Sequence, residues 1–196
     1  RSEGHTRAFL KVQDGCNQYC SYCIIPFLRG NIRSRRPGDV RREAERLAAS
    51  GVRELVLTGI HLSSYGRDFK NAAEREDFGD GAANLLELLT LLDSVEGIER
   101  LRIGSLEPKI ATPDFAAGLS SLRHFCPHFH LSLQSGSNAT LRRMGRRYTA
   151  EEFRAGVQAL RAAFPDAAMT TDVIVGFPGE SEEEFSESFS FIEEIR

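Results

Sequence analysis

The sequence lacks any long uninterrupted apolar run, which excludes a membrane-spanning helix of about 20 apolar residues. It also opens without a signal-peptide pattern. The composition, 41% apolar and 27% charged, is that of a soluble globular protein, and a length of 196 residues suits one domain. We therefore expect a single cytoplasmic domain.

Cysteine is scarce, and the few cysteines are unevenly placed. Only four occur in 196 residues, and three of them lie in the stretch DGCNQYCSYCIIPFLRG at 14–30. Cys16, Cys20 and Cys23 form the pattern C-x3-C-x2-C. This is a poor disulfide framework for a chain of this length. The pattern instead predicts metal or redox chemistry in a reducing compartment.

The net charge of −3 conceals a separation of charge along the chain. Arginines gather in residues 29–46 and again in 142–147, whereas 180–188 is acidic. Such clusters can bind phosphate or can simply be solvated surface. We expect both groups near the loop that carries the three cysteines, facing phosphates of a bound partner. They are Arg29, Arg33, Arg35, Arg36, Arg41, Arg42 and Arg46, then Arg142, Arg143, Arg146 and Arg147.

Apolar runs alternate with segments of helical period, which predicts βαβ units around a parallel sheet. Polar, glycine-bearing loops follow the expected strands, as in TGIHLSSYG, GSLEP, LQSGS and GFPGE, and this favours a (β/α) barrel or part of one. Residues 66–83 are expected to be a surface loop. The expected strands are 8–12, 54–58, 100–104, 129–133 and 169–177. The expected helices are 39–50, 83–95, 112–122, 149–164 and 181–195.

The spacing of the cysteine triad favours an iron–sulfur cluster over zinc. Structural zinc usually takes four protein ligands. A cubane cluster held by three cysteines keeps one iron open to another molecule. A rival zinc site could use His124, Cys126, His128 and His130, which alternate along the chain, although Pro127 interrupts them. Their alternative interpretation is as polar strand residues, with Cys126 as a small buried hydrophobe.

The triad, with Tyr22 before its last cysteine, resembles the signature of the radical S-adenosylmethionine (SAM) enzymes. With LTGIHLSSYG, GSLEP, HLSLQSGS, MGRRYT and DVIVGFPGE, the chain resembles the methylthiotransferases, most of all those acting on N6-threonylcarbamoyladenosine at position 37 of tRNA. The resemblance implies an α/β fold, a partial (β/α) TIM-like barrel of the radical SAM type. About five of six βα units would be present, with 1–196 as the radical SAM core domain. The last unit, an N-terminal methylthiotransferase domain and a C-terminal RNA-binding domain would lie outside it.

Roles for individual residues follow from this resemblance. Cys16, Cys20 and Cys23 would bind a [4Fe-4S] cluster. Tyr22 and the segment Val175 to Phe177 would lie at the adenine of SAM. Gly59 would lie near its amino group, and Arg146 at its carboxylate. Glu107 and Gln134 with Ser135 would lie near its ribose and amino-acid portion. Plainer interpretations stay open: Gly59 as a turn residue, Glu107 as a loop residue, Tyr22 as packing, and any neighbouring arginine in place of Arg146.

The reaction implied is one-electron cleavage of SAM, followed by hydrogen removal from adenine C2 and methylthio transfer. A tRNA substrate and an electron donor such as flavodoxin or ferredoxin are implied, as is a second [4Fe-4S] cluster in the N-terminal domain. Isopentenyladenosine in tRNA and a ribosomal protein are alternative substrates. A non-catalytic zinc- or RNA-binding module is the alternative of another class.

Overall fold

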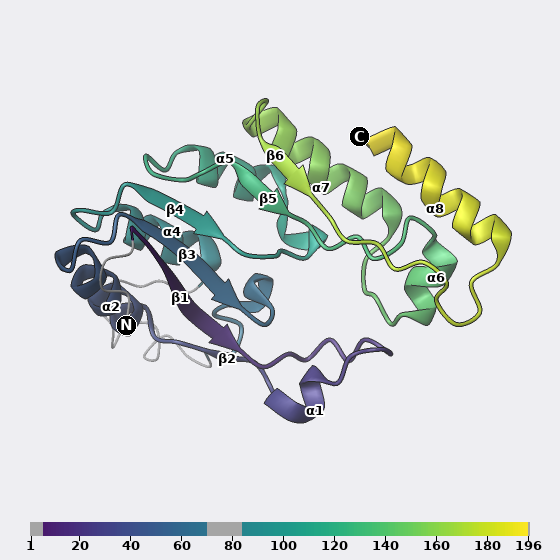
Figure 1. The fold of residues 1–196 in the computed structure, drawn as a ribbon, viewed down its shortest axis with the longest axis horizontal. Helices are drawn as coiled ribbons and strands as arrows, with labels where there is room; N and C mark the ends of the chain where they lie inside the picture. The colour runs from purple at the N-terminus through teal and green to yellow at the C-terminus, as the bar shows by residue number, and fades with distance from the viewer. Residues whose placement is uncertain (1–5, 70–83, 196) are drawn as a thin grey trace.

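The computed structural model describes residues 6–69 and 84–195, which form a curved layer of strands backed by helices (Figure 1). Five strands run parallel in chain order: β1 (Arg7–Asp14), β3 (Glu54–Gly59), β4 (Arg100–Ile103), β5 (His128–His130) and β6 (Ala168–Thr170). Single bridges at Leu101 with Phe125 and at Leu106 with Leu131 join the β4 and β5 segments. The predicted α/β fold and partial barrel are confirmed.

Helices return the chain from each strand to the next and pack on one another in chain order. Leucines of α4 and the Phe153 face of α7 enter the core. The expected capping box at the start of α7 is present, since Thr149 accepts from the backbone of Glu152 and the Glu152 carboxylate accepts from Thr149 N. These helices are α2 (Pro37–Ala49), α4 (Leu85–Asp93), α5 (Pro113–Ser120), α7 (Ala150–Ala163) and α8 (Glu182–Ile195).

The strand expected at 169–177 is observed only as the much shorter β6, Ala168–Thr170. Pairing with the β5 segment continues irregularly to Val173, which bridges to Gln134. The Thr171 hydroxyl interrupts the ladder because it donates to Leu131 O at 2.6 Å and accepts from Leu133 N at 3.0 Å. The expected strand 129–133 is shortened by the same irregularity.

Several short elements at the carboxyl side of the strands have no counterpart in the sequence-based prediction (Figure 1). Each is too short to show a periodic pattern. The expected loop 66–83 falls mostly outside the described residues. In the described part of the chain, no helix is both long and apolar enough to cross a bilayer. The short elements are α1 (Ile25–Arg29), β2 (Arg33–Ser34), η1 (Leu62–Ser64), η2 (Pro108–Ile110) and α6 (Asn138–Arg143).

Candidate functional site

A cavity of about 220 Å³ lies where the loops after β1, β3, β4 and β5 meet. The carboxyl ends of parallel strands share one edge, so these loops converge although they are far apart in sequence. Most of the predicted site residues line it: Cys16, Cys20, Cys23, Tyr22, Glu107, Gln134 and Arg146.

The cysteine loop leaves β1 through a tight turn. Gly15 has φ +70°, and a Cβ there would lie 1.9 Å from Asn31 O, so only glycine fits this position. Cys16 N donates to Gly30 O at 3.0 Å, which closes the loop at its base. The chain therefore returns beside its own start, with the cysteines on the enclosed side.

A second anchor ties the cysteine loop to the segment after α6. Ser21 N donates to Met144 O at 3.0 Å, and the Ser21 hydroxyl donates to Arg143 O at 2.9 Å. These bonds bring Arg146 to the cavity, where its Nη1 donates to Cys20 Sγ at 3.6 Å. A contact between residues 126 positions apart is thus supported by two hydrogen bonds from Ser21.

Burial raises the pKa of the Cys16 and Cys20 thiols, and at Cys20 the charge of Arg146 opposes this shift. Ligation must therefore release protons. Within the described residues, no three Cys, His, Asp or Glu side chains gather closely enough to hold one metal ion. In a cluster, by contrast, each of three thiolates binds a different iron.

Arg146 lies between two aromatic rings. Its guanidinium carbon is 6.0 Å from the Tyr22 centroid and 5.4 Å from that of Tyr148. Tyr148 is itself fixed, since its hydroxyl lies 2.7 Å from Ser132 O and 2.9 Å from Leu133 O. The buried Nε of Arg146 has no hydrogen-bond partner in the described chain. The arginine is therefore held in place with a donor still unused.

Glu107 follows β4 and is 8% exposed. Its Oε2 accepts from Gln18 Nε2 and lies near His61 Nε2, each at 3.2 Å. Burial acts to raise its pKa, but the His61 hydrogen bond and nearby arginine charges outweigh burial and lower it. Its Oε1 and Gln18 Oε1 are buried and lack partners among the residues described. Two residues that line the cavity thus each carry a buried acceptor without a partner in the described chain.

Gln134 adopts the left-handed backbone conformation, with φ +66°, which is uncommon for a residue with a side chain. Its backbone is held on both sides, because Gln134 N donates to Asp172 O and Ile174 N donates to Gln134 O. Such conformations cluster at ligand sites. Ser135 is fully buried and accepts from Ser137 N at 3.1 Å, a bond that shapes the turn.

The remaining predicted residues, Gly59, Ser135, Val175 and Phe177, are not among those that line the cavity. A Cβ on Gly59 would meet Gln13 Oε1 at 2.9 Å, so within the protein this glycine makes room for a buried side chain. Phe177 packs edge-on against Tyr22, with centroids 6.0 Å apart. Val175 is 64% exposed and lies along a second hollow, on the surface before α8. Their predicted roles at SAM remain predictions.

Among the cavity residues that were not predicted from the sequence, Gln18 and His61 are the two whose side chains contact Glu107. Both stand inside recognised motifs, Gln18 between the first two cysteines and His61 two positions after Gly59. Their position in these motifs was the available signal. Only the fold shows that they meet at Glu107.

Two of the three histidines of the rival zinc site, His124 and His130, have other partners. His124 Nδ1 lies 3.2 Å from Asp93 Oδ1, and His130 Nδ1 lies 3.0 Å from Thr170 Oγ1. Cys126 is partly buried on the strand-entry side, where its backbone pairs with Leu101. The alternating pattern therefore reflects a strand and its approach.

The arginine groups do not gather on one rim as expected. Arg29 and Arg33 lie beside the cysteine loop, but Arg46 is in the last turn of α2, which returns to the amino ends of the strands. Arg143 pairs with the acidic start of α8, and Arg146 enters the cavity. A helix 13 residues long separates its ends by roughly 20 Å, which divides the first group.

Known proteins resemble this chain over almost its whole length. The threonylcarbamoyladenosine tRNA methylthiotransferases MtaB of Chlamydia pneumoniae and Bacillus subtilis are 45% and 46% identical to it, over 98% and 96% of this chain. The tRNA-2-methylthio-N(6)-dimethylallyladenosine synthase of Pelobacter propionicus is 45% identical over 100%. The chain covers only 43%, 40% and 42% of these three relatives, or about two fifths of their length.

Solved structures share the fold at low identity. The radical SAM methyltransferase TsrM of Kitasatospora setae aligns with a TM-score of 0.74 at 19% identity, over 96% of this chain and 34% of its own. Coproporphyrinogen III oxidase (HemN) of Escherichia coli aligns at 0.61 and 16%, over 97% and 42%. The Radical SAM superfamily model matches residues 10–192. The chain therefore belongs to the radical SAM superfamily.

Proposed function

We propose that this chain is the radical SAM core of a tRNA methylthiotransferase acting on N6-threonylcarbamoyladenosine at position 37. The observation that carries the proposal is the convergence of three cysteines, Glu107 and Arg146 on one cavity. The relatives named above add support, since all three are tRNA methylthiolating enzymes by name. Their nearly equal identities do not separate this substrate from the dimethylallyl (isopentenyl) adenosine, which stays the alternative.

The cavity residues fit a [4Fe-4S] cluster and SAM. Cys16, Cys20 and Cys23 would hold the cluster, and three thiolates leave one iron for another ligand. Buried acceptors and a buried donor without partners among the described residues, at Glu107, Gln18 and Arg146, suit a ligand that carries ammonium, hydroxyl and carboxylate groups. When bound, the cluster and SAM supply the one-electron chemistry that removes a hydrogen atom from adenine C2.

The chain's own residues would bind and orient. Arg146, fixed between its tyrosines, would receive a carboxylate. Glu107 and Gln134 would accept from the amino-acid portion and ribose, with Ser135 supporting the turn. Tyr22, Val175 and Phe177 would border the adenine.

We assign the sulfur-donating second [4Fe-4S] cluster to sequence outside these residues, because 1–196 contains no second cysteine triad. On this proposal, an N-terminal methylthiotransferase domain, a sixth barrel unit and a C-terminal RNA-binding domain complete the enzyme. The tRNA substrate, a flavodoxin or ferredoxin as electron donor, and a cytoplasmic location belong to the same proposal.

Anaerobic reconstitution with iron and sulfide tests the function. The reduced chain should form 5′-deoxyadenosine from SAM without methylthiolating tRNA, because cleavage needs only the cavity described. Cys20→Ala should lose nearly all cluster iron and all cleavage. Cys126→Ala is the matched control and should keep both, since Cys126 lies on the strand-entry side.

Two outcomes would contradict the proposal. Zinc at one per chain without iron would support the non-catalytic module instead. Methylthiolated tRNA formed by this chain alone would place the sulfur donor within the barrel.

A further inference from the structure

The segment after β3 that contains His61 and the short helix η1 contacts Glu107 at both its backbone and its side chain. Ser63 is buried, and its hydroxyl accepts from Glu107 N at 2.9 Å. His61, which precedes η1, places Nε2 3.2 Å from Glu107 Oε2. The loop after β3 thus holds a residue that follows β4, 46 positions later in the chain.

His61 is held at three points. Its backbone N donates to Gln13 Oε1 at 2.7 Å, and its Nδ1 lies 2.5 Å from the hydroxyl of the buried Ser64. Gln13 in turn donates to Asp14 O and Gly15 O, both at 2.7 Å, at the start of the cysteine loop. The imidazole orientation is therefore coupled to the base of that loop.

The tautomer of His61 decides what Nε2 offers to Glu107, because Gln18 Nε2 also lies 3.4 Å from His61 Nε2. The Ser64 hydroxyl can donate to Nδ1, and in that tautomer the proton of a neutral ring lies on Nε2, facing the carboxylate. His61 then donates to Glu107 Oε2.

The two carboxylate oxygens of Glu107 therefore differ in their hydrogen bonding. Oε2 accepts from His61 and Gln18, whereas Oε1 is buried and has no partner in the described part of the chain. A buried acceptor without a partner is unfavourable for the folded state. Glu107 is held by Ser63 at its backbone and by His61 and Gln18 at Oε2, which together fix the position of Oε1.

We propose that His61 is a positioning residue for SAM binding, acting through Glu107. The inference rests on the proposed function, because it takes SAM as the ligand of the cavity. His61 fixes Oε2, and so directs Oε1 toward the donor groups of the ligand. Without it, Glu107 keeps one donor, Gln18, and can rotate away from its binding orientation.

The test measures SAM binding by calorimetry to the reconstituted, unreduced chain, with iron content determined in parallel. His61→Ala should weaken SAM binding about tenfold with unchanged iron. His61→Gln should restore binding to within about threefold of wild type, because its amide can donate from nearly the place of Nε2. His124→Ala is the matched control, since it removes an imidazole bound to Asp93, and should leave affinity unchanged.

Each result decides the inference. If wild type binds SAM and His61→Ala binds equally well, or if His61→Gln is as weak as His61→Ala, the donor role is wrong. If His61→Ala does not fold, Ser64→Ala removes only the hydroxyl on Nδ1 and should weaken binding two- to threefold, and unchanged binding would overturn the inference. A wild-type chain that loads iron but binds no SAM would instead refute the proposed function.

Discussion

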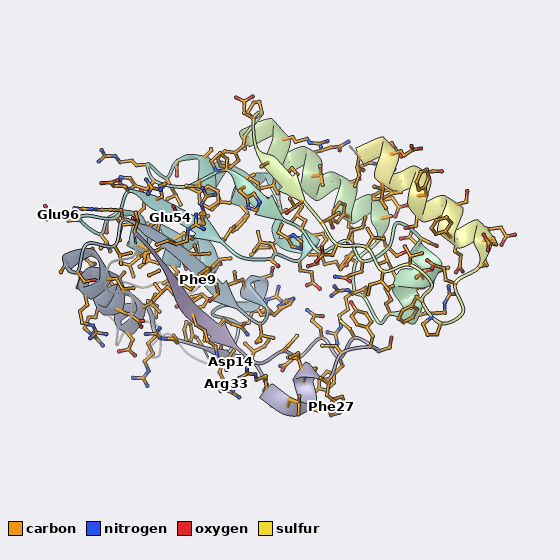
Figure 2. All side chains as sticks on the ribbon, in the orientation of Figure 1. Phe9, Asp14, Phe27, Arg33, Glu54 and Glu96 are labelled. Atoms are coloured by element: carbon orange, nitrogen blue, oxygen red, sulfur yellow. The ribbon has the colours of Figure 1, made fainter. Side chains whose placement is uncertain are left out.

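Two buried glutamates stand at opposite ends of the strands, and their surroundings differ. Glu54 begins β3 and is 5% exposed, and its two oxygens lie 2.6–2.9 Å from arginine nitrogens of Arg7, Arg100 and Arg102. Glu107, at the carboxyl end of β4, has no arginine within ion-pair distance among the described residues, and one of its oxygens is unpaired. Figure 2 shows Glu54 at the far end of the sheet from Asp14, where the cysteine loop begins.

The difference shows that the two ends of the strands differ in purpose, with one suited to folding stability and the other to ligand binding. At the amino ends every oxygen of the buried acid is satisfied, so that end contributes to folding. At the carboxyl ends, Glu107 has an acceptor and Arg146 a donor without a partner among residues 6–69 and 84–195, and Gln134 has a left-handed backbone. These features cost stability and suit a ligand.

The largest expected effect on folding stability is at Glu54, whose two carboxylate oxygens are both paired with arginines. Glu54→Ala should lower the free energy of unfolding by about 2 kcal/mol, below the 3–5 kcal/mol of a fully buried pair because the arginines are 33–53% exposed. Urea unfolding measures it. Cluster iron should not change. Glu99→Ala is the control, because Glu99 forms only long, exposed pairs with Arg53 and Arg100. Equal losses in both variants would remove the contrast.

At Glu107 we expect a smaller effect, on SAM affinity rather than on folding stability. Glu107→Gln keeps an acceptor for His61 and Gln18, so the free energy of unfolding should change by less than about 1 kcal/mol. SAM affinity should fall about tenfold, because a charge-assisted hydrogen bond becomes a neutral one. Calorimetry on the reconstituted chain measures it. A stability loss as large as that of Glu54→Ala, with SAM affinity kept, would make Glu107 a structural residue.

The smallest expected effect concerns the strained backbone. Gln134→Gly should raise the free energy of unfolding by about 0.5 kcal/mol, since relief of the left-handed conformation slightly exceeds the entropy cost of glycine. SAM affinity should fall because a cavity side chain is lost. Gln158→Gly, at an exposed position within α7, is the matched control and should destabilise by about 1 kcal/mol. Equal destabilisation by both would show that Gln134 is not strained.

Periodicity carried most of the fold prediction. The long helices and the strands β1, β3 and β4 were found close to their observed bounds, because a regular apolar face must repeat along the chain. The last two strands were overextended, since Thr171 replaces a backbone bond with a side-chain one, and this leaves no trace in the apolar pattern. The arginine groups were misjudged because proximity in sequence does not fix which end of a helix a residue occupies.

The sequence by itself determined the chemistry offered at the site: three thiols within eight positions, and polar residues after buried strands. Tertiary structure decided which of those residues meet. Arg146 reaches Cys20 only because the cysteine loop is anchored at Met144, and His61 reaches Glu107 only because β3 and β4 are parallel neighbours. Spacing along a chain fixes contacts over a few residues, whereas contacts across strands follow from strand order and loop geometry.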